Sequence, residues 1–188
     1  MEIKSTGIDG LFLIEPQVFR DDRGFFLESY QAQRYHDAGM NVDLIQDNHS
    51  RSKKGVLRGL HFQVKYPQAQ IVYVPRGRIF DVVVDLRPWS ATFKRWFGAE
   101  LSDECPRQLY MAGGFAHGFL VLSDVADVCY KVSRVYDSSD EGGLLWCDPD
   151  IGIKWPTTKP NVSSRDALFP RINQIPETKL PHKTSETN

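Results

Sequence analysis

The sequence predicts an all-β sandwich or barrel. Short runs rich in β-branched and aromatic residues recur along the 188-residue chain, and turn residues such as Asp9-Gly10 and Pro75-Arg76-Gly77 separate them. Residues 79–86 show the clearest strand pattern, because alternate side chains such as Val82 and Val84 share one face. Many short strands at this spacing are typical of antiparallel sandwiches and barrels.

The other strands are predicted from the same succession of turn and apolar run. A glycine or proline turn precedes most of them, for example at Gly10, Gly24, Pro67, Pro88 and Pro106. We therefore predict further strands over residues 11–14, 25–30, 55–63, 71–74, 93–101, 107–111, 115–122 and 125–135.

Two stretches have a helical pattern. Residues 31–38 end at Ala38-Gly39, and residues 163–167 form a single turn that Ser163 is placed to cap. No linker or internal repeat interrupts the chain, so we predict one domain over residues 1–188. Residues 171–188 are polar and contain prolines, and we expect them to form a tail on the surface.

Composition limits the classes of partner. Hydrophobic residues make up 41% of the chain and charged residues 25%, which is ordinary for a globular protein and excludes wholesale disorder. The formal net charge of -1 gives no electrostatic basis for nonspecific binding to nucleic acid. No apolar run approaches the roughly 20 residues of a membrane-spanning helix. We therefore expect neither nucleic acid nor a membrane as a partner.

The cysteines indicate a reducing compartment. Cys105, Cys129 and Cys147 are an odd number at wide spacing, which fits neither a disulfide framework nor a zinc site. The first residues contain charges and no apolar core, unlike a signal peptide. The expected location is the cytoplasm.

Two of the five histidines are candidates for proton transfer. His61 lies in a strand-like run and His117 in a glycine-rich one, whereas His36 and His182 are expected in solvent. The alternative for His61 and His117 is a core histidine bonded to a backbone carbonyl, and the residues alone leave both open. No His-x-His pair is present, so we predict no metal site.

Residues 46–50 form a dense polar segment. On a strand, Gln46, Asn48 and Ser50 would share one face and offer amide groups suited to a sugar or a base edge. A plain polar loop is the alternative.

Arginines and tyrosines supply further candidates. Arg23, Arg58 and Arg165 are possible anion ligands, although most arginines lie on the surface. Tyr130 and Tyr136 share a face of the predicted strand 125–135, where stacking on a ligand and ordinary sheet packing are both open.

Five runs of residues, taken in order, resemble the dTDP-4-dehydrorhamnose 3,5-epimerase family. Each run alone is a moderate signal, whereas the ordered set, which covers residues 5–170, is specific. The runs are 46–50 (QDNHS), 55–63 (GVLRGLHFQ), 77–87 (GRIFDVVVDLR), 114–119 (GFAHGF), and the ending from Leu145-Trp146 to Ala167.

The resemblance implies a fold, a reaction and an assembly. It implies a cupin-like jelly-roll barrel that works as a homodimer without a metal or organic cofactor. The implied substrate is a dTDP-linked 4-keto-6-deoxyhexose, namely dTDP-4-dehydro-6-deoxy-D-glucose. The implied reaction inverts C3 and C5 and gives dTDP-4-dehydro-L-rhamnose.

The resemblance also implies catalytic residues. The base corresponds to His61, which the carboxylate of Asp166 holds in the correct tautomer, and the acid corresponds to Tyr130. His117 corresponds to a donor to the enolate oxygen.

Further ligand contacts are implied in the same way. Tyr136 corresponds to a stacking partner of the thymine, and Glu141 and Arg165 correspond to other contacts. The positions implied for the nucleotide and its diphosphate are Arg23, Glu28, Gln46, Asp47, Asn48 and Arg58. Strand alternation puts Arg58 and His61 on opposite faces, so either Gly59 kinks the strand or the diphosphate wraps around the rim.

One residue departs from the family pattern. Gln70 stands where the family usually has a lysine, whose charge is expected to stabilise the enolate. Three explanations are open. Another cation such as Lys65 replaces the lysine, the substrate or the number of inverted centres differs, or catalysis is slower. A 3,4-ketoisomerase of the same barrel class and a noncatalytic nucleotide-sugar binder are the other functions left open.

Overall fold

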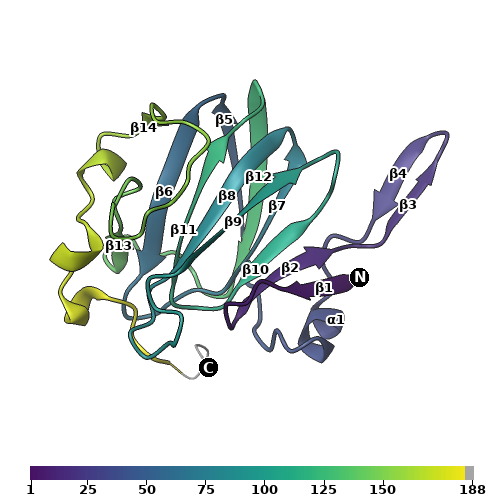
Figure 1. Ribbon diagram of the computed structural model, residues 1–188. Coiled ribbons are helices and arrows are strands. Elements are labelled where there is room, and N and C mark those ends of the chain that lie inside the picture. The colour runs from purple at the N-terminus through teal and green to yellow at the C-terminus, as the bar shows by residue number, and fades with distance from the viewer. Residues whose placement is uncertain (185–188) are drawn as a thin grey trace.

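The computed structural model describes residues 1–184, which form two facing sheets and a projecting hairpin (Figure 1). This is a jelly-roll architecture, so the predicted all-β fold class is confirmed. The first sheet contains, in spatial order, β1 (Glu2–Ser5), β2 (Leu11–Glu15), β10 (Gln108–Met111), β7 (Gln70–Arg76), β12 (Val125–Val132) and β5 (Gln46–Lys53). The second contains β13 (Glu141–Gly143), β6 (Val56–Gln63), β11 (Phe115–Val121), β8 (Arg78–Asp85) and β9 (Trp96–Ser102), with β14 (Asn161–Val162) beside β6.

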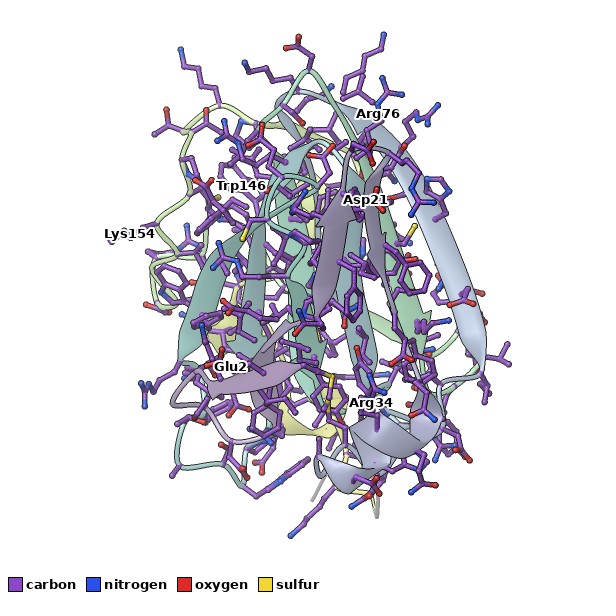
Figure 2. The ribbon with its side chains drawn as sticks, turned by 90° about the vertical axis from the view of Figure 1, so that its right-hand side faces the viewer. Glu2, Asp21, Arg34, Arg76, Trp146 and Lys154 are labelled. Carbon is purple, nitrogen blue, oxygen red and sulfur yellow. The ribbon has the colours of Figure 1, made fainter. Side chains whose placement is uncertain are left out.

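The hairpin of β3 (Val18–Asp21) and β4 (Gly24–Leu27) stands away from both sheets at the right of Figure 1. Figure 2 looks onto this side, with Asp21 of the hairpin above Arg34 of α1 (Ala32–Asp37). The chain ends with the short 3-10 helices η1 (Asp166–Leu168), η2 (Ile172–Gln174) and η3 (Glu177–Lys179).

Both faces of β8 are buried, and this divides the core in two. Ile79 and Val83 pack in the cluster between the two sheets. Val82 and Val84, on the other face, pack in a second cluster on the outer side of the second sheet. The alternation predicted for residues 79–86 is therefore confirmed, and both of its faces lie against apolar layers.

The segment after β14 covers this outer cluster. Figure 1 shows it, in yellow, at the left beside β6 and β13. Ile172 and Leu180 are only 4% and 5% exposed and belong to the cluster. The prediction of a surface tail is therefore wrong for these two residues, because each apolar side chain finds a place against the second sheet; residues 185–188 lie outside the described part.

Most predicted strands are present, within a few residues at their ends. The strand predicted at 25–30 is shorter, since β4 ends at Leu27, and β9 begins at Trp96 rather than at residue 93. The prediction missed β1, β3, β13 and β14, which are short and polar or glycine-rich, and it left open whether residues 46–50, now part of β5, form a strand or a polar loop.

The helical predictions hold in part. The side chain of Gln31 caps α1 by accepting a hydrogen bond from the Arg34 backbone N–H at 2.6 Å. Ser163 Oγ accepts one from the Asp166 N–H at 3.0 Å, although the turn that follows is a 3-10 helix. No helix among the described residues is long and apolar enough to cross a membrane.

Leu180→Ala tests the contribution of the C-terminal segment. We expect it to lower the free energy of unfolding by about 2–4 kcal/mol, because it leaves a cavity in the outer cluster. Urea denaturation measures the change, and Thr178→Ala, at an exposed position of the same segment, is the matched control. Equal stability of the two variants would show that the segment does not pack as described.

Candidate active site

An open pocket lies between the sheets at one end of the barrel. It encloses about 880 Å³ of space, open solvent at its mouth included, and polar side chains converge on it as in a small-molecule site. The second sheet contributes Arg58, His61 and His117, and the first sheet contributes Gln70 and Tyr130. A ligand in this pocket therefore has the histidines on one side and the tyrosine on the other.

A kink at Gly59 brings Arg58 and His61 to the same pocket. The pairing of β6 with β11 shifts register here, and Gly59 has a φ of 115°. A Cβ at Gly59 would lie 2.7 Å from the Gly118 Cα, so only glycine permits this approach of the strands. Of the two explanations left open by the sequence, the kinked strand is the one observed.

The carboxylate of Asp166 holds this kinked strand and the imidazole together. One oxygen accepts from the Gly59 N–H at 3.0 Å and the other lies 3.1 Å from His61 Nε2. Burial raises the pKa of Asp166, but the bonds from Gly59, His61 and Ser163 outweigh it and hold the pKa below its usual value. Asp166 is therefore ionised at neutral pH beside His61.

The contact with Asp166 assigns the proton on His61. A carboxylate only accepts hydrogen bonds, so Nε2 carries the proton and Nδ1 is left as the basic nitrogen. Arg165 Nη2 is also 3.2 Å from Nε2, but it cannot donate to a nitrogen that is itself a donor. Arg165 instead donates to Glu141 at 2.7 Å.

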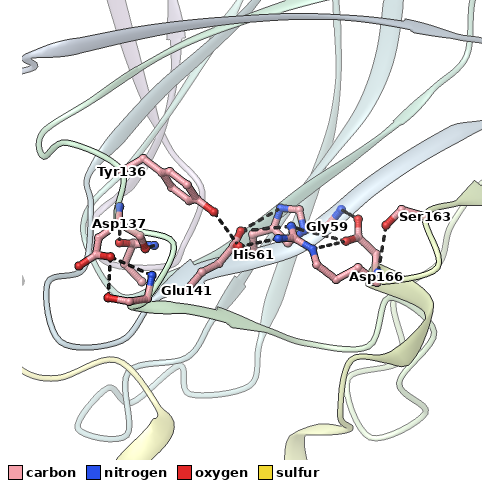
Figure 3. Close-up of polar contacts among 10 residues, drawn as sticks. Gly59, His61, Tyr136, Asp137, Glu141, Ser163 and Asp166 are labelled. Carbon is pink, nitrogen blue, oxygen red and sulfur yellow. Dashed lines mark hydrogen bonds and ion pairs between the residues drawn. The ribbon is translucent and has the colours of Figure 1, made fainter.

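Glu141 links Tyr136, at the mouth of the pocket, to His61. It accepts from the Tyr136 hydroxyl at 2.9 Å, and its other oxygen lies 4.0 Å from His61 Nδ1 (Figure 3). Phe169 packs edge-on against the His61 ring, and Gly143 leaves the space that Phe169 occupies. Packing and hydrogen bonds thus fix the ring of His61.

His117 forms a second histidine–carboxylate pair. It lies directly opposite His61 across the β6–β11 ladder, and its Nε2 is 2.9 Å from Asp81 Oδ2. Asp81 is fully buried, and His117 is 9% exposed. With Nε2 committed to Asp81, the nitrogen left for a ligand is Nδ1.

Tyr130 retains its proton at neutral pH. Burial raises its pKa, the charge of Arg58 lowers it, Glu141 raises it, and the net shift is upward. A phenol in this state is a proton donor to a more basic atom.

The remaining predicted contacts fall into two groups. Gln46 and Asn48 are bonded to each other and share a face of β5 with Ser50, which lines the pocket, and Gln46 also accepts from the Tyr136 N–H. Asp47 lies on the opposite face of β5, where it accepts from Lys131 at 2.7 Å. Within one chain, therefore, Asp47 does not reach the pocket.

Three charged residues lie elsewhere in the chain. Arg23 pairs with Asp21 on the projecting hairpin, and Glu28 pairs with Arg34. Neither is among the residues that line the pocket. Lys65, considered as a replacement cation, lines a separate cavity beside the C-terminal segment.

Sequence reasoning placed Ser50 on one face with Gln46 and Asn48, and Ser50 lines the pocket as that alternation predicts. Phe119 is among the lining residues that it missed. Phe119 gave no such signal, because an aromatic residue in a buried strand is usually part of the core.

A jelly-roll barrel with two histidine–carboxylate pairs and a protonated tyrosine around one pocket defines a cupin-like enzyme equipped for acid–base chemistry. The chain belongs to the dTDP-4-dehydrorhamnose 3,5-epimerase family, whose model matches residues 5–174.

Individual relatives cover nearly all of the chain. A dTDP-4-dehydrorhamnose 3,5-epimerase of Salmonella typhimurium is 47% identical over 93% of this chain and 97% of its own. A dTDP-4-dehydrorhamnose 3-epimerase of Streptomyces niveus is 43% identical over 88% of this chain and 81% of its own. The crystal structure of a 3,5-epimerase from Legionella pneumophila, in complex with dTDP-4-keto-L-rhamnose, superimposes with a TM-score of 0.94 at 44% identity, covering 98% of this chain and 99% of that one.

Asp166→Asn tests the ionised state of this carboxyl. Its lowered pKa stabilises the folded protein above the ordinary value of about 3.9, and this stabilisation is lost as the pH falls through the folded-state pKa. We expect the variant to be about 1–3 kcal/mol less stable at neutral pH and the gap to close below about pH 4. Urea denaturation from pH 7 to about pH 3 measures the gap.

The matched control is Asp150→Asn, at an exposed carboxylate. We expect it to show no such gap. A gap at Asp166 that stayed constant into acid would contradict an ionised Asp166.

Proposed function

We propose that this protein inverts C3 and C5 of dTDP-4-dehydro-6-deoxy-D-glucose and gives dTDP-4-dehydro-L-rhamnose. One observation supports it above the others: a carboxylate-held His61 and a protonated Tyr130 line one pocket from opposite sheets. Inversion needs this arrangement, because a base must remove a proton from one face of the sugar and an acid must return one to the other.

The proton transfers follow from the C4 ketone. Nδ1 of His61 takes the proton from the neighbouring carbon, and the C–H electron pair moves to the carbonyl oxygen as an enolate. Asp166 stabilises the imidazolium that forms. Tyr130 then delivers its proton to the same carbon from the opposite face, and the tyrosinate and imidazolium exchange protons with solvent before the second centre reacts.

The enolate oxygen requires donors, and this is usually a large part of catalysis. His117 is held beside His61 by the buried carboxylate of Asp81. With Nε2 committed to Asp81, Nδ1 is the atom through which His117 would bond this oxygen. Chemistry of this kind uses protons alone and calls for no cofactor.

The nucleotide is bound at the mouth of the pocket. Among residues 1–184, Arg58 is the one basic side chain of the lysine and arginine type that lines the pocket, and its guanidinium is suited to the diphosphate. The ring of Tyr136 is 48% exposed and can stack on the thymine. Gln46 and Asn48 offer amides beside it.

A homodimer accounts for the contacts that one chain leaves out. Three aromatic residues of the hairpin, Phe19, Phe25 and Phe26, are 60%, 56% and 68% exposed, which is unusual for a surface. We infer that the hairpin packs on a second copy and carries Arg23 and Glu28 toward that copy's pocket.

The protein has three free thiols, of which Cys105 and Cys147 are exposed, and this fits a cytoplasmic enzyme.

Deuterium exchange tests the reaction. In heavy water the wild type is expected to exchange the C3 and C5 protons of the substrate, read by proton NMR. His61→Ala should lower exchange at both carbons at least ~100-fold, because it removes the base. Tyr130→Phe should keep exchange, because His61 can return a deuteron to the face from which it took the proton. The variant should form inverted product about 100-fold more slowly.

The control variant is His49→Ala, an exposed histidine on the outer face of β5, which should behave as wild type. Equal loss of exchange and product in both site variants would contradict the division of roles. Exchange at C3 alone would identify a single-centre 3-epimerase, a ketone moved to C3 would identify a ketoisomerase, and no exchange by a folded protein would leave only a binder.

Mixing two inactive variants tests the shared site. Arg23→Ala lacks the arginine that reaches the other copy, whereas His61→Ala lacks the base of its own pocket. In a mixed dimer, one pocket has its own His61 and the partner copy's intact hairpin. We expect activity to return to about a quarter of wild type on mixing, with half of the dimers mixed and one working pocket in each. Failure to recover, with light scattering showing mixed dimers, would place Arg23 outside the site.

A further inference from the structure

Gln70 begins β7 at a point where the backbone is firmly held. The Ala69 N–H donates to Ser133 Oγ at 2.9 Å, and the Ser133 N–H donates to the Ala69 carbonyl at 3.0 Å. Gln68 Nε2 donates to the Arg134 carbonyl at 2.8 Å. The strand therefore presents Gln70 to the pocket from a fixed position.

The amide oxygen of Gln70 is buried and has no hydrogen-bond partner among residues 1–184. Three other polar groups of the pocket are satisfied within the protein, namely His61 by Asp166, His117 by Asp81 and Gln68 by a backbone carbonyl. Ser50 Oγ, which lines the same pocket, shares with Gln70 the lack of a partner among residues 1–184. A buried acceptor without a donor is unfavourable unless a ligand or a bound water supplies the donor.

Gln70 lies on the same side of the pocket as Tyr130. Its cross-strand partner on β12 is Val132, two residues from Tyr130, so the two inward side chains are diagonal neighbours. A ligand group that bonds Gln70 is therefore close to the carbon that Tyr130 protonates.

We propose that Gln70 is a specificity-determining residue whose Oε1 accepts a hydrogen bond from a ring hydroxyl of the sugar. This rests on the proposed function and specifies the substrate class further. A dTDP-linked 4-keto-6-deoxyhexose has only two ring hydroxyls, at C2 and C3, since C1 bears the diphosphate, C4 the ketone and C5 the methyl group. A lysine at this position would only donate, so glutamine selects for a sugar with a donor here.

Deoxy sugars test the assignment through exchange at C5, which every sugar in the set permits. Gln70→Met has nearly the same shape but no acceptor. We expect it to lower kcat/KM roughly tenfold for the full sugar and for the deoxy sugar that keeps the recognised hydroxyl. The other deoxy sugar, which lacks that hydroxyl, should react with an unchanged kcat/KM.

Two further variants separate acceptance from donation. Gln70→Lys should lose the preference for the hydroxylated sugar, whereas Gln70→Glu should retain it even if its rate is lower. Gln33→Met on α1 is the control and should leave all three rates as in wild type. Equal losses on all three sugars in Gln70→Met, or a preference kept by Gln70→Lys and lost by Gln70→Glu, would overturn the proposal.

Stability gives an independent readout. Because Oε1 has no partner among residues 1–184, Gln70→Met should melt at or above the wild-type temperature. A drop of several degrees would show that a hydrogen bond within the protein had been lost.

Calorimetric binding of the unreactive 4-hydroxy analogues, with and without the C2 and C3 hydroxyls, separates the proposal for Gln70 from the proposed epimerase activity. A wild type that binds with hydroxyl preference but does not exchange would refute the epimerase and uphold Gln70.

Discussion

The site depends on the carboxylate of Asp166, which bonds both a backbone N–H and an imidazole. Asp166 accepts from the Gly59 N–H and from His61, so the residue that orients the proposed base also holds the kinked strand on which this base lies. Without the kink, alternation along β6 would turn Arg58 and His61 to opposite faces. The cation and the base therefore share a pocket only because a buried oxygen satisfies the backbone where the ladder is broken.

The C-terminal segment explains why that carboxylate is in place. It buries the outer face of the second sheet through Ile172 and Leu180, and the same stretch of chain carries Asp166 and Phe169 to the back of His61. Packing that looks purely structural is thus coupled to the position of the base. The facing sheet supplies Tyr130 independently, so the proposed base and the proposed acid come from different sheets of the jelly roll.

Local pattern predicted the parts of this structure that are determined locally. Alternation identified β8 and its two faces, although not that both are buried, and their place in strand-like runs singled out His61 and His117. Asp166 lies more than a hundred positions from its partner, so only the family resemblance linked the two. Ile172 and Leu180 lie in a mostly polar stretch without a sustained apolar periodicity, so the sequence pattern does not predict their burial. The kink at Gly59 was one of two open explanations, because pairing of distant strands, not local sequence, decides it.

The charges of the pocket support the proposal that a second copy of the chain completes it. The substrate brings a dianionic diphosphate and develops a further negative charge as the enolate forms. Against this, Arg58 is the one arginine or lysine lining the pocket in the part of the chain described, while Arg165 is neutralised by Glu141 at 2.7 Å. Gln70 adds no charge. If Arg58 binds the diphosphate, the enolate depends on His117, and the second phosphate charge calls for a cation from outside the chain. The projecting hairpin has exposed aromatic rings to pack on a second copy, and its Arg23, whose side chain is 85% exposed, would exchange its pairing with Asp21 for the diphosphate.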